Sequence, residues 1–173
     1  MTSSSQTEGE FPRLFDVRQC EGKQVHLVAE EAERVALAKR FDIVRVDRLE
    51  ADLVLTRHDR DVAVAGTMRA DIVQPCAISA EDLPVTVEEE IALRFIPAVQ
   101  RTTADEEIEL EAEDLDEIEY EGTQIDVGEA VAQSLALAID PFLTGPEADG
   151  ARQRPEFNNT DGNAFSALKD LKL

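Results

Sequence analysis

The sequence predicts an α+β domain, in which an antiparallel β-sheet of about five to six strands packs against two helices. Two observations carry this prediction. Apolar and polar residues alternate through three successive segments in the middle of the chain, as they do in strands with one buried face. Apolar residues recur at helical spacing in two further segments, one before and one after these strands. The 173 residues are enough for a single domain with its own core.

Composition and charge limit the class of protein. The chain is 43% hydrophobic and 32% charged, which is typical of a soluble globular protein, and its formal net charge is -21. No apolar stretch approaches the roughly 18 residues that a membrane span needs. The two cysteines, Cys20 and Cys76, are expected to be free thiols in a reducing compartment, so we expect a cytoplasmic protein. Like-charge repulsion disfavours self-association and predicts a monomer.

The N-terminal part begins with a disordered leader over residues 1–10. Segments 11–17 and 23–29 are predicted to be a pair of strands, with Glu21 and Gly22 at the turn between them. Residues 30–41 are predicted to form a helix, with acidic residues at its start and basic residues at its end, as the helix dipole favours. The apolar stripe of this helix is expected to consist of Ala32, Val35, Ala36 and Lys39, widened by Leu37 and Phe41.

Three strands follow, over residues 43–56, 61–73 and about 85–96, with a polar hairpin loop at 57–60 and a loop at 74–84. Gly66 interrupts the second strand and indicates a bulge or a close backbone approach. Pro97 is expected to end the third strand. The residues expected on the buried face are Leu49, Ala51, Leu53, Leu55, Val62, Val64, Met68, Ala70, Ile72, Val85, Val87, Ile91, Leu93 and Phe95.

A long acidic loop is predicted over residues 100–122. Within it, residues 105–121 contain eleven carboxylates and no Lys or Arg. This acidic run is either a solvated loop that only adds solubility, or a surface that binds a basic protein. Its candidate partner-binding residues are Asp105, Glu106, Glu107, Glu109, Glu111, Glu113, Asp114, Asp116, Glu117, Glu119 and Glu121.

A second helix is predicted to open at Asp126, because Asp126 and Glu129 have the spacing of a capping box, and to end before Pro141. Its apolar stripe is expected to be Val127, Ala130, Val131, Leu135, Ala138 and Ile139. Residues 144–173 are predicted to be a flexible tail that ends in a short amphipathic segment. Three apolar residues recur in that segment, Phe165, Leu168 and Leu171, and they dock either on the protein's own sheet or on a partner.

No catalytic, cofactor or metal site is predicted. His26 lies in an alternating segment and is expected to be a surface residue, and His58 lies in a charged loop without a recognisable nucleophile motif nearby. Cys76 has no cysteine or histidine at the short spacing that metal sites use. The glycines stand singly, so no phosphate-binding loop is indicated. We therefore expect a protein that is not an enzyme.

Several short motifs, taken in order, carry a resemblance to one family. They are ERVALAKRF at 33–41, VAGTMRADIVQPC at 64–76, FIP at 95–97, IDVGE at 125–129, LALAIDP at 135–141 and NAFSALK at 163–169. With the acidic run between them, they resemble the YceD family, the large ribosomal RNA subunit accumulation proteins. The residues of these motifs that we single out are Gly66, Cys76, Asp126 and Pro141. Many members have a second cysteine where this chain has Ser79.

The resemblance implies a non-enzymatic role in large-subunit ribosomal RNA accumulation, and genes that often neighbour that of a small basic ribosomal protein. Together with the acidic run, it predicts that the protein binds a basic ribosomal protein or a large-subunit assembly intermediate. The alternative is direct binding of ribosomal RNA through a local basic patch, although acidic residues interleave with it and no aromatic stacking motif accompanies it. That patch would consist of Arg34, Lys39, Arg40, Arg45, Arg48, Arg57 and Arg60.

Overall fold

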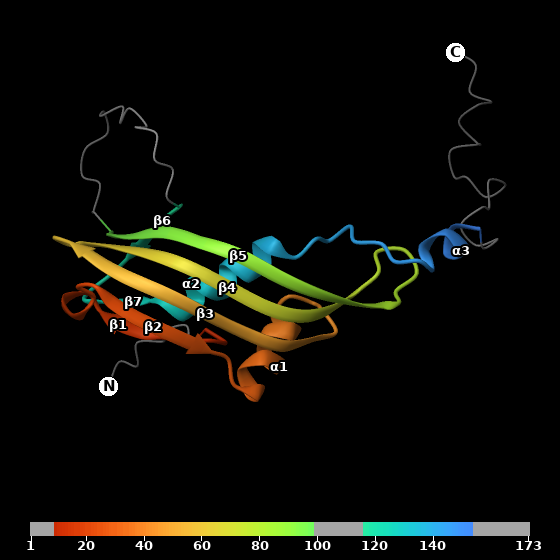
Figure 1. Ribbon diagram of the computed structural model, residues 1–173, viewed down its shortest axis with the longest axis horizontal. Coiled ribbons are helices and arrows are strands. Elements are labelled where there is room, and N and C mark those ends of the chain that lie inside the picture. The colour runs from red at the N-terminus through yellow and green to blue at the C-terminus, as the bar shows by residue number, and fades with distance from the viewer. Residues whose placement is uncertain (1–8, 99–115, 154–173) are drawn as a thin grey trace, which may run out of the picture.

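The structure, a computed structural model, describes residues 9–98 and 116–153 (Figure 1). The strands are β1 (Leu14–Asp16), β2 (Lys23–Val28), β3 (Arg45–His58), β4 (Asp61–Pro75), β5 (Asp82–Pro97), β6 (Asp116–Tyr120) and β7 (Gln124–Asp126). The helices are a 3-10 turn η1 (Val17–Gln19), α1 (Glu31–Arg40), α2 (Val127–Ala138) and α3 (Ala148–Arg152). Among these described residues, no helix is both long enough and apolar enough to span a bilayer.

The architecture is a five-stranded sheet, ordered β2-β3-β4-β5-β6, with a separate two-stranded sheet of β1 and β7. Helices α1 and α2 pack against the sheet in one core, and α2 lies behind β4 and β5 in Figure 1. The predicted α+β class is confirmed. The pairing is antiparallel from β2 to β5, as predicted, but β6 runs parallel to β5, which the sequence analysis did not anticipate.

The period-two patterns of the three long strands correctly identify the buried face. All the residues expected there are buried, except Val85, which is half-buried against the core. The hairpin between β3 and β4 is tighter than predicted, because His58 still pairs with Asp61 and only residues 59 and 60 form the turn. The next loop is shorter too, since β4 extends to Pro75 and β5 starts at Asp82. Alternation alone therefore located the face but not the strand ends.

Gly66 lies at a close approach between β3 and β4. It pairs with Leu53, and a Cβ atom at this position would overlap the carbonyl oxygen of Asp52 and lie 2.9 Å from the Cα of Leu53. Of the two possibilities predicted for Gly66, the structure has the close backbone approach. The irregularity in the ladder lies elsewhere, between Val46 and Arg48.

Helix α1 forms where it was predicted, but a different face is buried. Leu37 and Ala38 are buried and Phe41 packs on the core, whereas Val35 is 65% exposed and Ala32 is exposed. The larger Leu37 and Phe41 side chains bury more apolar surface than alanines can, so they decide which face turns inward.

The N-terminal segments do not pair with each other as predicted. β1 pairs antiparallel with β7, more than a hundred residues along the chain, while β2 is the edge strand beside β3. The predicted leader of residues 1–10 is too long, because Glu10 is ion-paired to Arg40 at 2.8 Å. Residues 1–8 lie outside the described part.

Helix α2 confirms Asp126 as its N-cap, but the reciprocal half of the capping box does not form, because the Glu129 carboxylate binds Arg40. The predicted stripe is buried up to Leu135, whereas Ala138 is only partly buried and Ile139 lies just beyond the helix. Asp126 accepts a hydrogen bond from the N–H of Glu129 at 3.0 Å, and Val127, Val131 and Leu135 are fully buried. The chain after Pro141 was expected to be a flexible tail from residue 144, but residues 148–152 form α3, with Ala148 and Ala151 buried. Residues 154–173 lie outside the described part.

Candidate partner-binding surface

The structure describes only the last part of the acidic run. Asp116, Glu117, Glu119 and Glu121 are described and exposed. The other seven candidates lie outside the described residues, namely Asp105, Glu106, Glu107, Glu109, Glu111, Glu113 and Asp114. Phe165, Leu168 and Leu171 also lie outside them. The prediction that these residues bind a partner stays a prediction.

Residues 116–120, predicted to belong to a loop, instead form β6 at the edge of the main sheet. They do so because Ile118 and Tyr120 alternate with the carboxylates. Ile118 and Tyr120 pack against the core, and the Tyr120 hydroxyl donates a 2.6 Å hydrogen bond to the carbonyl of Arg60. Two inward side chains are therefore enough to hold an otherwise acidic segment in the sheet, and they fix its exposed carboxylates on a defined backbone.

The parallel register pairs β6 with residues 93–97 of β5, just beyond an acidic stretch of that strand. Asp116 pairs with Leu93, which is three residues, or roughly 10 Å along the strand, from Glu90. Glu88, Glu89 and Glu90 are all exposed. We call the residues Glu88–Glu90 together with Asp116, Glu117 and Glu119 the acidic edge.

Two arginines partly neutralise the acidic edge. Arg69 pairs with Glu88, and Arg94 lies 3.9 Å from Glu117, whose side chain is 55% exposed. Exposed pairs of this kind are worth about 0–1 kcal/mol, so they can exchange for a partner's cations at little cost. The acidic edge therefore has net negative charge that remains accessible.

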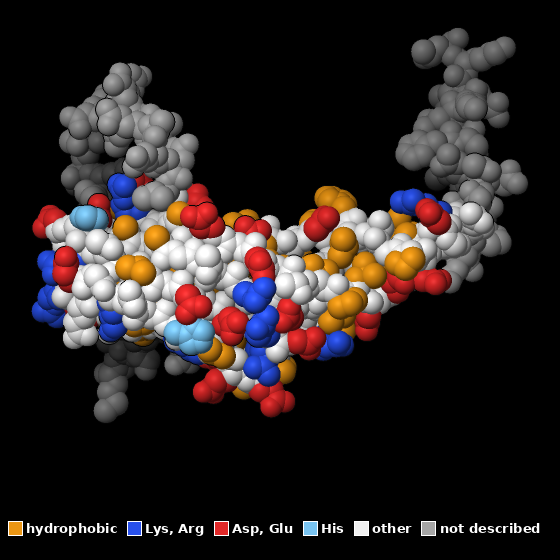
Figure 2. All heavy atoms as spheres, in the orientation of Figure 1, with side chains coloured by type: hydrophobic (Ala, Val, Ile, Leu, Met, Phe, Trp, Pro, Cys, Tyr) orange, Lys and Arg blue, Asp and Glu red, His pale blue; other side chains and the backbone are white. Residues whose placement is uncertain are grey.

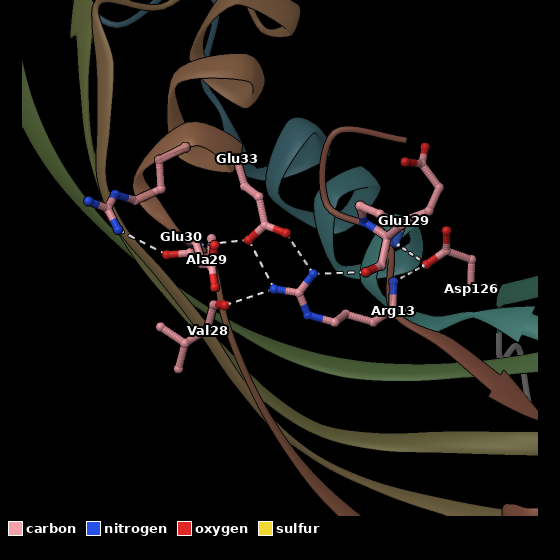
Figure 3. Close-up of polar contacts among 9 residues, drawn as sticks. Arg13, Val28, Ala29, Glu30, Glu33, Asp126 and Glu129 are labelled. Atoms are coloured by element: carbon pink, nitrogen blue, oxygen red, sulfur yellow. Dashed lines mark hydrogen bonds and ion pairs between the residues drawn. The ribbon is translucent and has the colours of Figure 1, made fainter. Parts of the chain in front are cut away.

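A network of ion pairs joins the N-terminal segment to the two long helices (Figure 3). The Arg13 guanidinium donates to both oxygens of Glu33 on α1, at 2.7 and 2.9 Å, and its backbone N–H donates to Asp126 at 2.9 Å. Arg40 likewise bridges α1 to Glu129 on α2, at 2.7 Å. The hydrogen bond from Arg13 lowers the pKa of Glu33, and the one from Arg40 lowers the pKa of Glu129. The network fixes the N-terminal segment and the start of α2 against α1.

The predicted basic patch is divided, and three of its seven residues are paired with carboxylates. Arg45 and Arg48 contact Asp47 and Asp71, each at 2.9 Å, and Arg40 is in the network above. Figure 2 shows basic and acidic side chains intermixed across the visible face. Arg48 and Arg57 are nine residues apart on one strand, which separates them by roughly 30 Å. The candidates, which also include Arg34, Lys39 and Arg60, do not form one continuous cationic surface.

Cys76 lies in the loop between β4 and β5 and is buried, and both cysteines are free, as predicted. Its sulfur accepts hydrogen bonds from the N–H groups of Ser79 and Gly145, each at 3.4 Å. Hydrogen bonds from Ser79, and then from Gly145, outweigh burial and lower the pKa of the thiol to about 7. Because Gly145 follows Pro141 in the segment leaving α2, Cys76 helps to hold that segment against the loop.

In residues 9–98 and 116–153, no group of three or more His, Cys, Asp or Glu side chains is arranged to hold a metal ion. His26 is surface-facing, as predicted, with Nδ1 2.7 Å from Asp52. Sequence reasoning missed Arg13 and the Glu88–Glu90 stretch, although three adjacent carboxylates were a visible signal for the latter.

The fold and this surface define an α+β protein whose prominent exposed feature is an acidic sheet edge. A family model described as large ribosomal RNA subunit accumulation protein YceD matches residues 64–172, which is more than half of the chain. The chain therefore belongs to the YceD family. No curated protein and no solved structure matches it.

Proposed function

We propose that the protein is a non-catalytic assembly factor that supports accumulation of large-subunit ribosomal RNA, and that it does so by binding a basic ribosomal protein or a large-subunit assembly intermediate. The observation that carries this proposal is the acidic edge. Its carboxylates are exposed, they are held on β5 and β6, and they continue into the rest of the acidic run. Membership of a family named for accumulation of this RNA supplies the ribosomal context.

Charge favours a basic protein over RNA as the molecule in direct contact. Affinity for phosphate backbones comes from cations that displace counterions, and a net charge of -21 opposes it. Three of the basic residues that could form an RNA-binding patch, Arg40, Arg45 and Arg48, are paired with the protein's own carboxylates, and the candidates lie in separate places. A cationic protein gains attraction from the same charge distribution.

Co-purification of ribosomal proteins from a cell extract, with the full chain as bait, tests the proposal. Recovery of basic large-subunit proteins should fall steeply with salt, because the screening length shrinks from about 8 Å at physiological ionic strength to about 3 Å at 1 M. Replacing the eleven carboxylates of residues 105–121 with Asn or Gln should abolish recovery at physiological salt.

The control must show whether recovery depends on where the negative charges lie or only on how many there are. A variant with Asn or Gln at Asp116, Glu117, Glu119 and Glu121 should lose recovery more than one with the same replacements at four other exposed acids, Glu21, Glu31, Asp82 and Glu147. Unchanged recovery in the eleven-residue variant would overturn the proposal. Saturable binding of large-subunit RNA fragments to the isolated protein at physiological salt would favour direct RNA binding instead.

A further inference from the structure

A groove of about 640 Å³ opens beside β6, between β6, β7 and the start of α2. Its apolar lining includes Leu14, Phe95 and Ile118, and its acidic lining includes Glu119, Glu121 and Glu129. Among the described residues that line it, none is Lys or Arg. Leu14 is 52% exposed, which leaves apolar surface available in the groove.

The groove runs beside the outer edge of β6. The carbonyl of Tyr120 accepts a 2.8 Å hydrogen bond from the N–H of Ala98, on the β5 side. Backbone groups of successive residues in a strand alternate sides, so the N–H and C=O of Glu119 point to the outer edge. Within residues 9–98 and 116–153, no strand pairs with this outer edge of β6. An extended peptide can therefore add here as a further strand.

The start of α2 also adjoins the groove, and a helix N-terminus by itself favours an anion. Here two of the N–H groups in its first turn already have acceptors. The N–H of Glu129 donates to the Asp126 carboxylate at 3.0 Å, and that of Val127 donates to the carbonyl of Arg13 at 3.0 Å. Glu129 is already paired with Arg40, but neither Glu119 nor Glu121 forms an ion pair within the described part of the chain. Their full charges exceed the partial charge of the capped helix end, so the groove favours a cation.

We propose that this groove binds an extended segment of a partner protein that carries Lys or Arg, which pairs along β6 and places alternate apolar side chains in the groove. The inference rests on the proposed function in that the partner is a basic protein, and it adds where and in what conformation that partner is held. The apolar lining distinguishes this groove from a surface that attracts cations by charge alone, since it selects segments in which basic and apolar residues alternate.

A fluorescently labelled peptide of sequence KVKVRVKV is a suitable probe, with its anisotropy measured against the full chain. Its affinity should exceed that of KSKSRSKS, which has the same charge but no apolar side chains. Glu119→Gln removes one charge and keeps the N–H, whereas Glu119→Pro removes both, and an edge strand tolerates proline where the N–H faces outward. Glu119→Pro should bind the probe about fivefold more weakly than Glu119→Gln, because one backbone hydrogen bond is lost.

Leu14→Ser tests the apolar lining and should weaken the valine peptide but leave the serine peptide unchanged. Glu31→Gln, on exposed α1, is the matched control for charge and should have no effect beyond the small one expected for a distant exposed carboxylate. Melting temperatures identify any variant that is unfolded, and Leu14→Ser decides the question if Glu119→Pro fails to fold. Equal affinity for both peptides, or no effect of Leu14→Ser, would overturn the groove.

The groove and the proposed function can fail separately. If the Leu14→Ser variant still recovers ribosomal proteins fully but the eleven-residue variant does not, binding in the groove is refuted and binding by the acidic residues is supported. If neither variant loses ribosomal proteins, both proposals are wrong.

Discussion

Substituting Gly66 with alanine tests the close contact between the two central strands. The new Cβ would overlap the Asp52 carbonyl oxygen and lie 2.9 Å from the Cα of Leu53, whereas non-bonded carbons pack best at about 3.5–4.0 Å. Relief requires β3 and β4 to separate by roughly 1 Å at this point, which lengthens the ladder hydrogen bonds there beyond useful geometry.

The loss of about two backbone hydrogen bonds, at about 1 kcal/mol each, and of the packing around them gives an expected destabilisation of about 2–4 kcal/mol. Reduced entropy of the unfolded chain returns only about 0.4–1 kcal/mol. The net loss is therefore about 1–3.6 kcal/mol. For a chain of this size, each kcal/mol lowers the melting temperature by about 2–4 °C, so the fall should be about 2–14 °C.

Differential scanning calorimetry measures this fall directly. Gly150→Ala is the control, because a Cβ at Gly150 meets nothing within 4 Å and the residue lies in α3, where alanine is the better helix former. Its melting temperature should be unchanged or slightly higher. A Gly66→Ala protein that melts with the wild type would refute the reasoning, since it would mean that the strands are not in contact at this point.

Two further predictions concern the motif residues Asp126 and Cys76. Asp126 accepts hydrogen bonds from the N–H groups of both Arg13 and Glu129, so Asp126→Ala should lower the free energy of unfolding, measured by urea denaturation, by about 2 kcal/mol, at the upper end for a helix cap. Asp126→Asn keeps an acceptor oxygen and should stay within a few tenths of a kcal/mol of wild type. Equal losses in the two variants would show that the charge of Asp126, and not its acceptor oxygen, stabilises the protein. The pKa of Cys76 falls on folding from 9.0 to about 7, so its thiolate contributes stability above about pH 9 that disappears as the pH falls through 7. The difference in unfolding free energy between wild type and Cys76→Ala should therefore grow from pH 7 to pH 9, and a difference that is flat with pH would contradict the hydrogen-bonded thiolate.

The sequence predicts well where local pattern and tertiary structure agree. Leu53 and Val64 lie in long strands whose apolar–polar alternation is evident over any short stretch of sequence, so their burial follows from period two alone. Asp126 combines a cap residue with a helical stripe, and both point to the same helix start. Gly66 could be singled out because a glycine inside such a strand weakens it and often marks a bulge or a close backbone approach.

The features that the sequence did not reveal depend on distant parts of the chain. β1 is only three residues long and exists because β7 pairs with it, so no local window contains both. β6 was hidden because its composition is acidic, and only Ile118 and Tyr120 connect it to the core. The groove combines β6 with Leu14 and α2, so it could not be seen before the register was known.

The acidic composition of β6 also disfavours association of the protein with further copies of itself. An open strand edge is a template for pairing with any extended chain, including another copy of itself. Two β6 strands set edge to edge would bring Asp116, Glu117 and Glu119 of one copy against those of the other, and like charges facing each other across a strand pair are destabilising. Such an edge can pair with a cationic strand but repels a second copy of β6. The carboxylates that would bind a basic partner would therefore also disfavour edge-to-edge association of the free protein into fibres.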